Sequence, residues 1–153
     1  MSRAFVKDGD QEFEELPDRL ISEHPNLVTR EGLAQIEAEI ARLSAEFAAA
    51  QSAQDREALA TAARDLRYWK ARQLTAEIVT LPADVAHVHF GSTVTIKRED
   101  GRRQTFRIVG EDEAEPAKGT IPYVAPLARA LVGKGVGDVV RVGEGEIEVL
   151  EVR

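Results

Sequence analysis

The sequence predicts an α+β protein in which an N-terminal antiparallel helical hairpin, or coiled coil, precedes a small antiparallel β-sheet domain with one short helix. Three observations predict this fold. Apolar residues recur in alternating steps of three and four over residues 33–50, which is the spacing of a coiled-coil seam. A second helix-favouring stretch follows after only a few polar residues. Beyond Pro82 the apolar period changes to two, which is typical of strands.

The predicted chain therefore has three parts. Residues 1–27 form an acidic arm with seven acidic and three basic residues. Their few apolar residues follow no period, so we expect an extended or partly ordered segment. Two interpretations of the arm stay open: a solvated tail, or a segment whose Phe5, Phe13 and Leu16 pack on the body of the protein or on a partner. Residues 28–82 form the hairpin, and residues 83–153 form the sheet domain.

The bulk composition excludes several classes of protein. The chain has 153 residues, of which 43% are hydrophobic and 5% aromatic, so it can bury an aliphatic core. It contains no cysteine, which excludes disulfides and thiolate metal sites. No apolar run is long enough for a membrane span, and the acidic N-terminus is unlike a signal peptide. We therefore expect a cytoplasmic protein. Its net charge of -7 argues against general coating of nucleic acids.

The helical hairpin is the most periodic part of the chain. Thr29 is a candidate N-cap for the first helix, with Glu31 in the first turn, where the helix dipole favours an acid. The second helix is expected over residues 56–79, and the short turn between the two requires an antiparallel arrangement. The predicted seam of the first helix consists of Leu33, Ile36, Ile40, Leu43, Phe47 and Ala50.

The sheet domain is expected to begin with a β-hairpin. Its strands cover residues 88–97 and 103–109, and the Asp100-Gly101 pair forms the turn. A short strand over residues 121–124 and a short helix over residues 126–132 follow. A final hairpin then joins strands at residues 139–142 and 147–152.

Several runs resemble the Gre factors, the bacterial transcript-cleavage and elongation factors GreA and GreB. Their order and spacing are similar to those of the family's C-terminal domain, closer to GreB, and LVTREG at residues 27–32 is similar to the start of its N-terminal domain. The C-terminal runs are Phe90-Gly91, FRIVG at 106–110 with Asp112 and Glu113 behind it, and PLARAL at 126–131 followed by Lys134 and VGD at 136–138.

The resemblance implies an FKBP-like C-terminal domain and a regulator of transcription elongation that binds RNA polymerase at its secondary channel. Such a factor is not itself an enzyme, because the polymerase carries out any RNA cleavage. We expect a monomer without a membrane partner, which meets nascent RNA and DNA only within the elongation complex. The residues that match the polymerase-binding part are Pro126 and Arg129, with Asp112 and Glu113 as further candidates. Pro126 is also explained as the first residue of a helix, and the two acids as loop residues.

The family's hairpin tip carries two acids that help to hold a catalytic magnesium ion, in a motif that is absent here. The acids nearest to the predicted tip are Asp55 and Glu57, and these are the candidate catalytic residues. They are two positions apart, which does not place side chains on one face of a helix. Residues 52–55 also fit a capping box, which gives Asp55 a structural alternative. We predict no cofactor of the protein's own, and magnesium only as an ion shared with the polymerase active site.

The second helix carries a basic stripe of Arg64, Arg67 and Lys70. One interpretation is contact with RNA or with the walls of the polymerase channel, and the other is an exposed face balanced by neighbouring acids.

The hairpin is about twenty residues shorter than that of the Gre factors, or about 15 Å per helix. This favours a non-cleaving inhibitor or competitor of Gre factors, similar in layout to the Rnk protein, over stimulation of cleavage. A remote alternative is an FKBP-like prolyl isomerase or chaperone, but Phe90, Phe106 and Tyr123 offer few aromatic side chains for its pocket.

Overall fold

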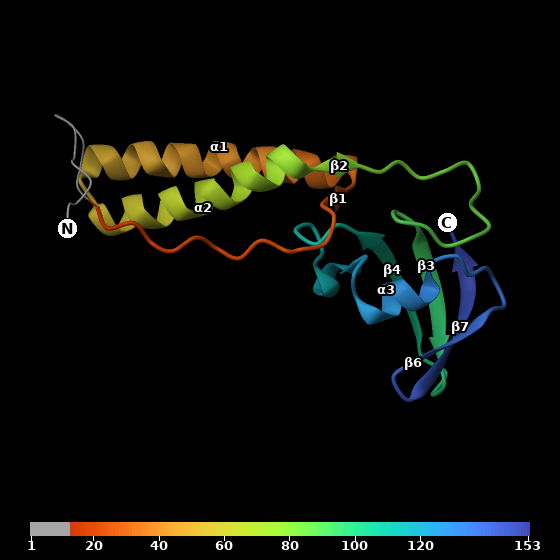
Figure 1. Ribbon diagram of the computed structural model, residues 1–153. Coiled ribbons are helices and arrows are strands. Elements are labelled where there is room, and N and C mark those ends of the chain that lie inside the picture. Colours follow the sequence, from red (N-terminus) through yellow and green to blue (C-terminus); the bar gives the residue numbers. More distant parts are fainter. Residues whose placement is uncertain (1–12) are drawn as a thin grey trace. The chain divides into compact units, whose positions relative to one another are not determined.

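The computed structural model describes residues 13–153 and forms two compact units (Figure 1). The helical unit holds residues 35–75 together with residues 13–23 of the arm. The sheet unit holds residues 24–34 and 76–153. Helix α1 (Arg30–Ala53) is shared, because its first residues belong to the sheet unit and the remainder to the helical unit.

Helices α1 and α2 (Arg56–Thr75) run antiparallel in the helical unit and are joined by only two residues (Figure 1). Gln54 adopts a left-handed conformation with φ of 56°. Its amide donates to the Gln51 carbonyl over 3.2 Å, and the Asp55 amide donates to the Ala50 carbonyl over 3.0 Å. These bonds use carbonyls that the end of α1 would otherwise leave unpaired. The predicted helical hairpin is confirmed, with its tip at Gln54.

The seam of α1 is the one that the spacing predicts. Ile36, Leu43 and Ala50, which are seven residues apart, are buried, while Ile40 and Phe47 between them are half-buried. Burial of one large aliphatic side chain contributes about 1.5–3 kcal/mol, so this stripe stabilises the pairing of the helices. Its counterparts on α2 are Leu59, Ala60 and Ala62.

Helix α2 ends at Thr75, so the prediction of a helix to residue 79 is wrong. Strand β2 (Glu77–Ile78) pairs in parallel with β1 (Leu27–Val28) instead. The Glu77 amide donates to the Asn26 carbonyl over 2.9 Å, and the Val79 amide to the Val28 carbonyl over 3.0 Å. Residues 78–80 are all β-branched, which favours an extended backbone over a helical one.

The main sheet has five strands in the order β5-β4-β3-β7-β6. Strand β5 is parallel to β4, so the sheet is mixed and the prediction of a purely antiparallel sheet is wrong at this edge. The reason is the connection: residues 110–119, with a 3₁₀ turn at Pro116–Lys118, bring the chain back alongside Arg107 of β4, so that β5 runs in the same direction as the last residues of β4. The strands are β3 (Thr93–Arg98), β4 (Arg103–Val109), β5 (Thr120–Pro122), β6 (Val139–Val142) and β7 (Gly145–Val152).

Strand β3 begins five residues later than predicted, because Phe90 and Gly91 form a turn and Gly91 has a φ of 92°. The later strand and helix bounds lie within two residues of the predicted ones. Helix α3 (Pro126–Leu131) adds Ala128 and Leu131 to the core of the sheet. That core is aliphatic except for Phe106: Val88, Val94, Ile96, Phe106, Ile108, Ala128, Leu131, Val140, Ile147 and Val149.

Two long helices followed by a mixed sheet confirm the α+β class, and the FKBP-like fold implied by the resemblance is compatible with it. Within residues 13–153, no helix has both the length and the apolar character needed to cross a membrane.

Candidate functional site

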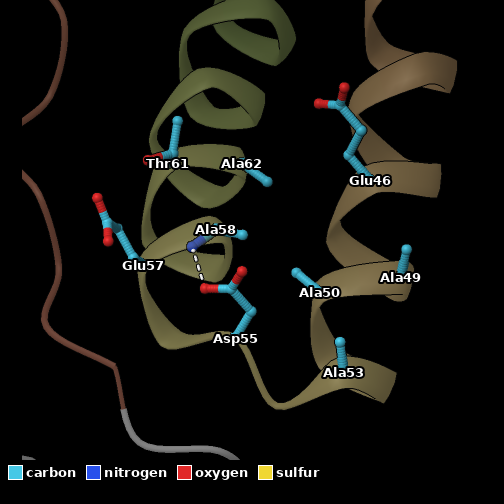
Figure 2. A pocket seen from close by; sticks show the side chains of 9 residues that line it. All are labelled: Glu46, Ala49, Ala50, Ala53, Asp55, Glu57, Ala58, Thr61 and Ala62. Carbon is cyan, nitrogen blue, oxygen red and sulfur yellow. Dashed lines mark hydrogen bonds between the residues drawn. The ribbon is translucent and has the colours of Figure 1, made fainter.

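The tip of the helical hairpin is where the candidate acids lie. Asp55 directly precedes α2, and its Oδ1 accepts a hydrogen bond from the Ala58 amide over 3.0 Å (Figure 2). This is the geometry of an N-cap, which satisfies one of the amides that a helix start leaves unpaired. Ser52 belongs to α1 rather than to the turn. The cap is therefore Asp55 itself, and the predicted capping box beginning at Ser52 is wrong.

Glu57 does not join Asp55. Figure 2 shows the Glu57 carboxylate on the side of α2 turned away from α1, whereas the Asp55 carboxylate turns back onto the first turn of its own helix. Both acids are exposed. They line the rim of a hollow of about 590 Å³ whose floor is mainly alanine methyl groups.

A divalent ion such as magnesium requires several converging oxygen ligands, and these two carboxylates do not converge. The pair therefore does not fit a shared magnesium ion. In the part of the chain that the structure describes, no three acidic or histidine side chains gather in a way that could hold a metal ion.

Three basic residues of α2, Arg64, Arg67 and Lys70, follow one another in steps of three and form a stripe that drifts around the helix. Arg64 pairs with the adjacent Asp65 at 3.0 Å. Arg67 contacts the arm twice, because its Nε donates to the Asp18 carboxylate over 2.5 Å and its Nη2 donates to the Leu16 carbonyl over 2.8 Å. Lys70 is exposed.

The described part of the arm packs on the helical unit. The Phe13 ring meets the Phe47 ring of α1 edge-on, with centroids 6.5 Å apart. The Arg19 guanidinium lies 3.9 Å from the centre of the Tyr68 ring and forms an ion pair with Asp65 at 3.5 Å. For Phe13 the structure favours the packed interpretation over the solvated tail. Phe5 lies outside the described residues.

The short helix α3 has an exposed face next to a buried one. Pro126 is its first residue and is exposed, as is Arg129, one turn later on the same face. Ala128 and Leu131 face the core. The conformation of Pro126 is thus explained by helix initiation, and the exposed pair leaves a small surface free for contact.

Glu113, one of the candidate polymerase-binding acids, is engaged within the sheet unit. Its carboxylate accepts hydrogen bonds from the Thr29 amide over 2.9 Å, from the Thr29 hydroxyl, and from the Gly110 amide over 3.1 Å. The Thr29 hydroxyl oxygen also accepts from the Gly32 amide over 2.9 Å, which confirms Thr29 as the N-cap of α1. We call Thr29, Gly32, Gly110 and Glu113 the Glu113 clasp. The neighbouring Asp112 is half-buried.

The two glycines of the clasp leave no room for a side chain. A Cβ added at Gly110 would lie 2.3 Å from the Leu27 carbonyl oxygen, and one at Gly32 would lie 2.3 Å from a Glu113 carboxylate oxygen. The sequence alone did not predict the Glu113 clasp. The available signal was that both family-like runs, LVTREG and FRIVG, end in glycine.

A second contact within the sheet unit joins the first turn of α1 to β4. Arg107 forms an ion pair with Glu31 at 2.8 Å, and its Nε donates to the Gly91 carbonyl over 3.1 Å. The hydrogen bond from Arg107 and the positive charge beside it lower the pKa of Glu31 below its ordinary value of 4.5.

The aromatic residues of the sheet unit pack in the core or on each other. Phe106 is part of the core. Phe90 and Tyr123 pack edge to face on each other at 5.8 Å, and the Tyr123 hydroxyl donates to the Pro25 carbonyl over 2.5 Å.

Comparison with known proteins places this geometry in a family. The model of the family described as "Transcription elongation factor, GreA/GreB, C-term" matches residues 83–153. The transcription elongation factor GreA of Chelativorans sp. (strain BNC1) is 36% identical over 146 residues, which cover 92% of this chain and 89% of that protein. The chain belongs to the GreA/GreB family. It is therefore a homologue of transcription elongation factors.

Other members resemble this Gre-family chain over shorter or weaker matches. The GreB of Neisseria meningitidis serogroup B is 46% identical over 69 residues, 42% of each chain. Several relatives, this one included, are matched over less than half of their length. Among solved structures, the GreA factor homolog 1 (Gfh1) of Thermus thermophilus has a TM-score of 0.39 at 21% identity, covering 85% of this chain and 99% of that one.

Proposed function

We propose that this Gre-family chain binds RNA polymerase at the secondary channel and modulates elongation by occupying the channel, without stimulating transcript cleavage. It acts as an accessory protein in the cytoplasm, as a monomer, and holds no cofactor of its own. RNA and DNA are met only within the elongation complex. The observation that carries the proposal is the tip, where Asp55 caps a helix and Glu57 faces the other way.

Stimulation of transcript cleavage requires carboxylates that bind the same divalent ion as the attacking water. The tip of this hairpin offers no such pair. Reach supports the same conclusion, because helices of 24 and 20 residues extend only about 36 Å and 30 Å at the helical rise. A catalytic group has little effect unless it comes within hydrogen-bonding distance of the reacting atoms.

Docking on the polymerase is proposed for the exposed face of α3, with Pro126 and Arg129 at its centre. This helix lies within residues 83–153, the region that matches the family. Asp112 remains a candidate for the same surface. Glu113 is proposed to act indirectly, by shaping the loop next to it, because its carboxylate is already hydrogen-bonded within the clasp.

The basic residues of α2 are proposed to meet RNA phosphates or acidic channel walls. Arg64, Arg67 and Lys70 follow one another at three-residue spacing, and side chains three residues apart on a helix are neighbours. Such contacts are electrostatic and weaken as salt is added.

The test uses backtracked elongation complexes in the presence of magnesium. Added alone, the chain is expected to leave the rate of release of short 3′ RNA fragments unchanged. Added together with a GreB protein, it is expected to slow the release that GreB stimulates.

The matched variant carries Asp55→Ala and Glu57→Ala and is expected to behave like the natural chain in both assays. Faster release with the chain alone, abolished by these two substitutions, would establish cleavage stimulation and overturn the proposal. Catalysis of prolyl isomerisation by the chain would favour the remaining alternative.

A further inference from the structure

We propose that residues 13–19 of the arm form a strap that competes with RNA phosphates for the basic side of α2. This inference rests on the proposed role of that side in meeting polyanions, and it adds a regulatory element to it. In Figure 1 the arm, drawn in red to orange, runs along α2 within the helical unit. The strap would lower the affinity of the free protein for nucleic acid and yield to a stronger ligand.

The central contact of the strap is with Arg67. The guanidinium gives one N–H to the Asp18 carboxylate at 2.5 Å and another to the Leu16 carbonyl at 2.8 Å. Arginine binds phosphate through the same N–H groups, usually two at a time. A phosphate that binds the Nε and Nη2 edge of Arg67 therefore competes directly with the strap for the same two N–H groups.

The strap and α2 each contribute one acid and one base to the contact between them. An acid of the strap, Asp18, meets a base of the helix, and the next residue, Arg19, meets an acid of the helix, Asp65, at 3.5 Å. The Arg19 guanidinium also stacks on Tyr68 at 3.9 Å from the ring centre. A cation over an aromatic ring is attracted by the negative face of the ring.

The far end of the strap is apolar. Phe13 is half-buried and meets Phe47 of α1 edge-on, an arrangement that aromatic rings prefer to a face-to-face sandwich. Together, these contacts fix the register of the strap on the helices, which a chance electrostatic association would not do.

The central ion pair of the strap is exposed and therefore weak. Asp18 has a side-chain exposure of 75% and Arg67 of 37%. Exposed ion pairs of this kind contribute little to stability, so a polyanion with several phosphates can displace the strap. The strap thus tunes binding rather than preventing it. A single-stranded RNA is the favoured ligand because it is extended and presents regularly spaced anions.

The experiment measures binding of a fluorescein-labelled single-stranded oligoribonucleotide to the full chain by fluorescence anisotropy at low salt. Asp18→Asn is expected to tighten binding about two- to fivefold, since it removes one exposed ion pair. Arg67→Gln is expected to weaken binding, and Asp18→Asn is expected to give no gain when Arg67→Gln is present. The matched control is Glu15→Gln, an exposed strap residue with the same change of charge and no ion pair among the described residues.

Three results would overturn the strap. The first is an equal gain from Asp18→Asn and Glu15→Gln, which would reduce the effect to net charge. The second is a gain for a polyglutamate peptide but none for RNA, which would make the competitor an acidic protein segment. The third is an unchanged emission of Trp69, the single tryptophan, at saturating oligonucleotide. Because the strap lies 5.9 Å from this ring through Arg19, its release is expected to shift the emission towards that of an Arg19→Ala variant.

Association of the chain with RNA polymerase is measured separately. Failure of that association would reject the proposed function while leaving the oligonucleotide result to decide the strap.

Discussion

Replacement of Glu113 by alanine removes the acceptor of three hydrogen bonds at once. They come from the Thr29 amide, the Thr29 hydroxyl and the Gly110 amide. A hydrogen bond to a charged group contributes about 1.5–3 kcal/mol net, and the half-buried position of Glu113 reduces each contribution. We therefore expect Glu113→Ala to lower the free energy of unfolding by about 2–4 kcal/mol. Glu113→Gln, which keeps one amide oxygen as an acceptor, is expected to cost about half as much.

The assay is urea unfolding of the full chain followed by far-UV circular dichroism. Hydrogen exchange at the Gly110 amide, measured by NMR, reports the clasp directly and is expected to accelerate in Glu113→Ala. Thr29→Ala, which removes the N-cap of α1, should cost about 1–2 kcal/mol. The free energy of unfolding of the double variant should fall by less than the sum of the two single effects, because both substitutions remove the hydrogen bond from the Thr29 hydroxyl to Glu113.

The control is Glu115→Gln in the same loop. Among the described residues, the side chain of Glu115 makes only an exposed ion pair with Lys118 at 3.2 Å, so its replacement is expected to change the free energy of unfolding by less than about 0.5 kcal/mol. A Glu113→Ala variant as stable as this control, with unchanged exchange at Gly110, would refute the idea that the clasp holds the start of α1.

Three further comparisons test other parts of the structure. Gly110→Ala is expected to destabilise the chain by at least about 2 kcal/mol, since its Cβ meets a backbone oxygen, whereas Gly145→Ala enters open space and should be tolerated in the same thermal melt. Asp55→Ala should cost about 1 kcal/mol by urea unfolding through loss of the helix cap, against less than about 0.5 kcal/mol for Glu57→Ala. Glu31 has a lowered pKa in the folded state, so its ion pair stabilises the protein above pH 4.5 and is lost as the pH falls through that lower pKa. The difference in Tm between the natural chain and Glu31→Gln should therefore be present at pH 7 and disappear in acid.

The parts of the fold that the sequence predicted are those set by local pattern. The seam at Ile36, Leu43 and Ala50 follows from a repeat within one helix, and all three residues are buried. The turn at Asp100-Gly101 follows from the left-handed conformation that glycine tolerates, and Gly101 has a φ of 86°. Neither feature requires knowledge of a distant residue.

The parts that the sequence did not predict depend on distant partners. The end of α2 is decided by pairing of β2 with β1, and β5 is parallel because of the path of the preceding loop. Glu113 and Thr29 are 84 residues apart in the chain, so no local pattern joins them. Similarly, the contact of Arg67 with Asp18 spans 49 residues, so no local pattern predicts it.

At the candidate site, the sequence predicted the tip near Gln54, and it predicted that Asp55 and Glu57, two positions apart, do not lie on one face of a helix. Asp55 and Glu57 are candidates because they are the acids nearest to the tip in sequence. The two carboxylates do not converge on one ion. The Asp55 carboxylate accepts a hydrogen bond from the Ala58 amide, and the Glu57 carboxylate lies on the side of α2 turned away from α1 (Figure 2).

The central claim is that the chain occupies the secondary channel of RNA polymerase. Its most direct test is displacement of a fluorescently labelled GreB protein from core polymerase by increasing amounts of the unlabelled chain. We expect full displacement by the natural chain, and weaker displacement by a Pro126→Ala, Arg129→Glu variant that melts at the same temperature. Labelled GreB that stays bound at a large excess of the folded chain would contradict the account.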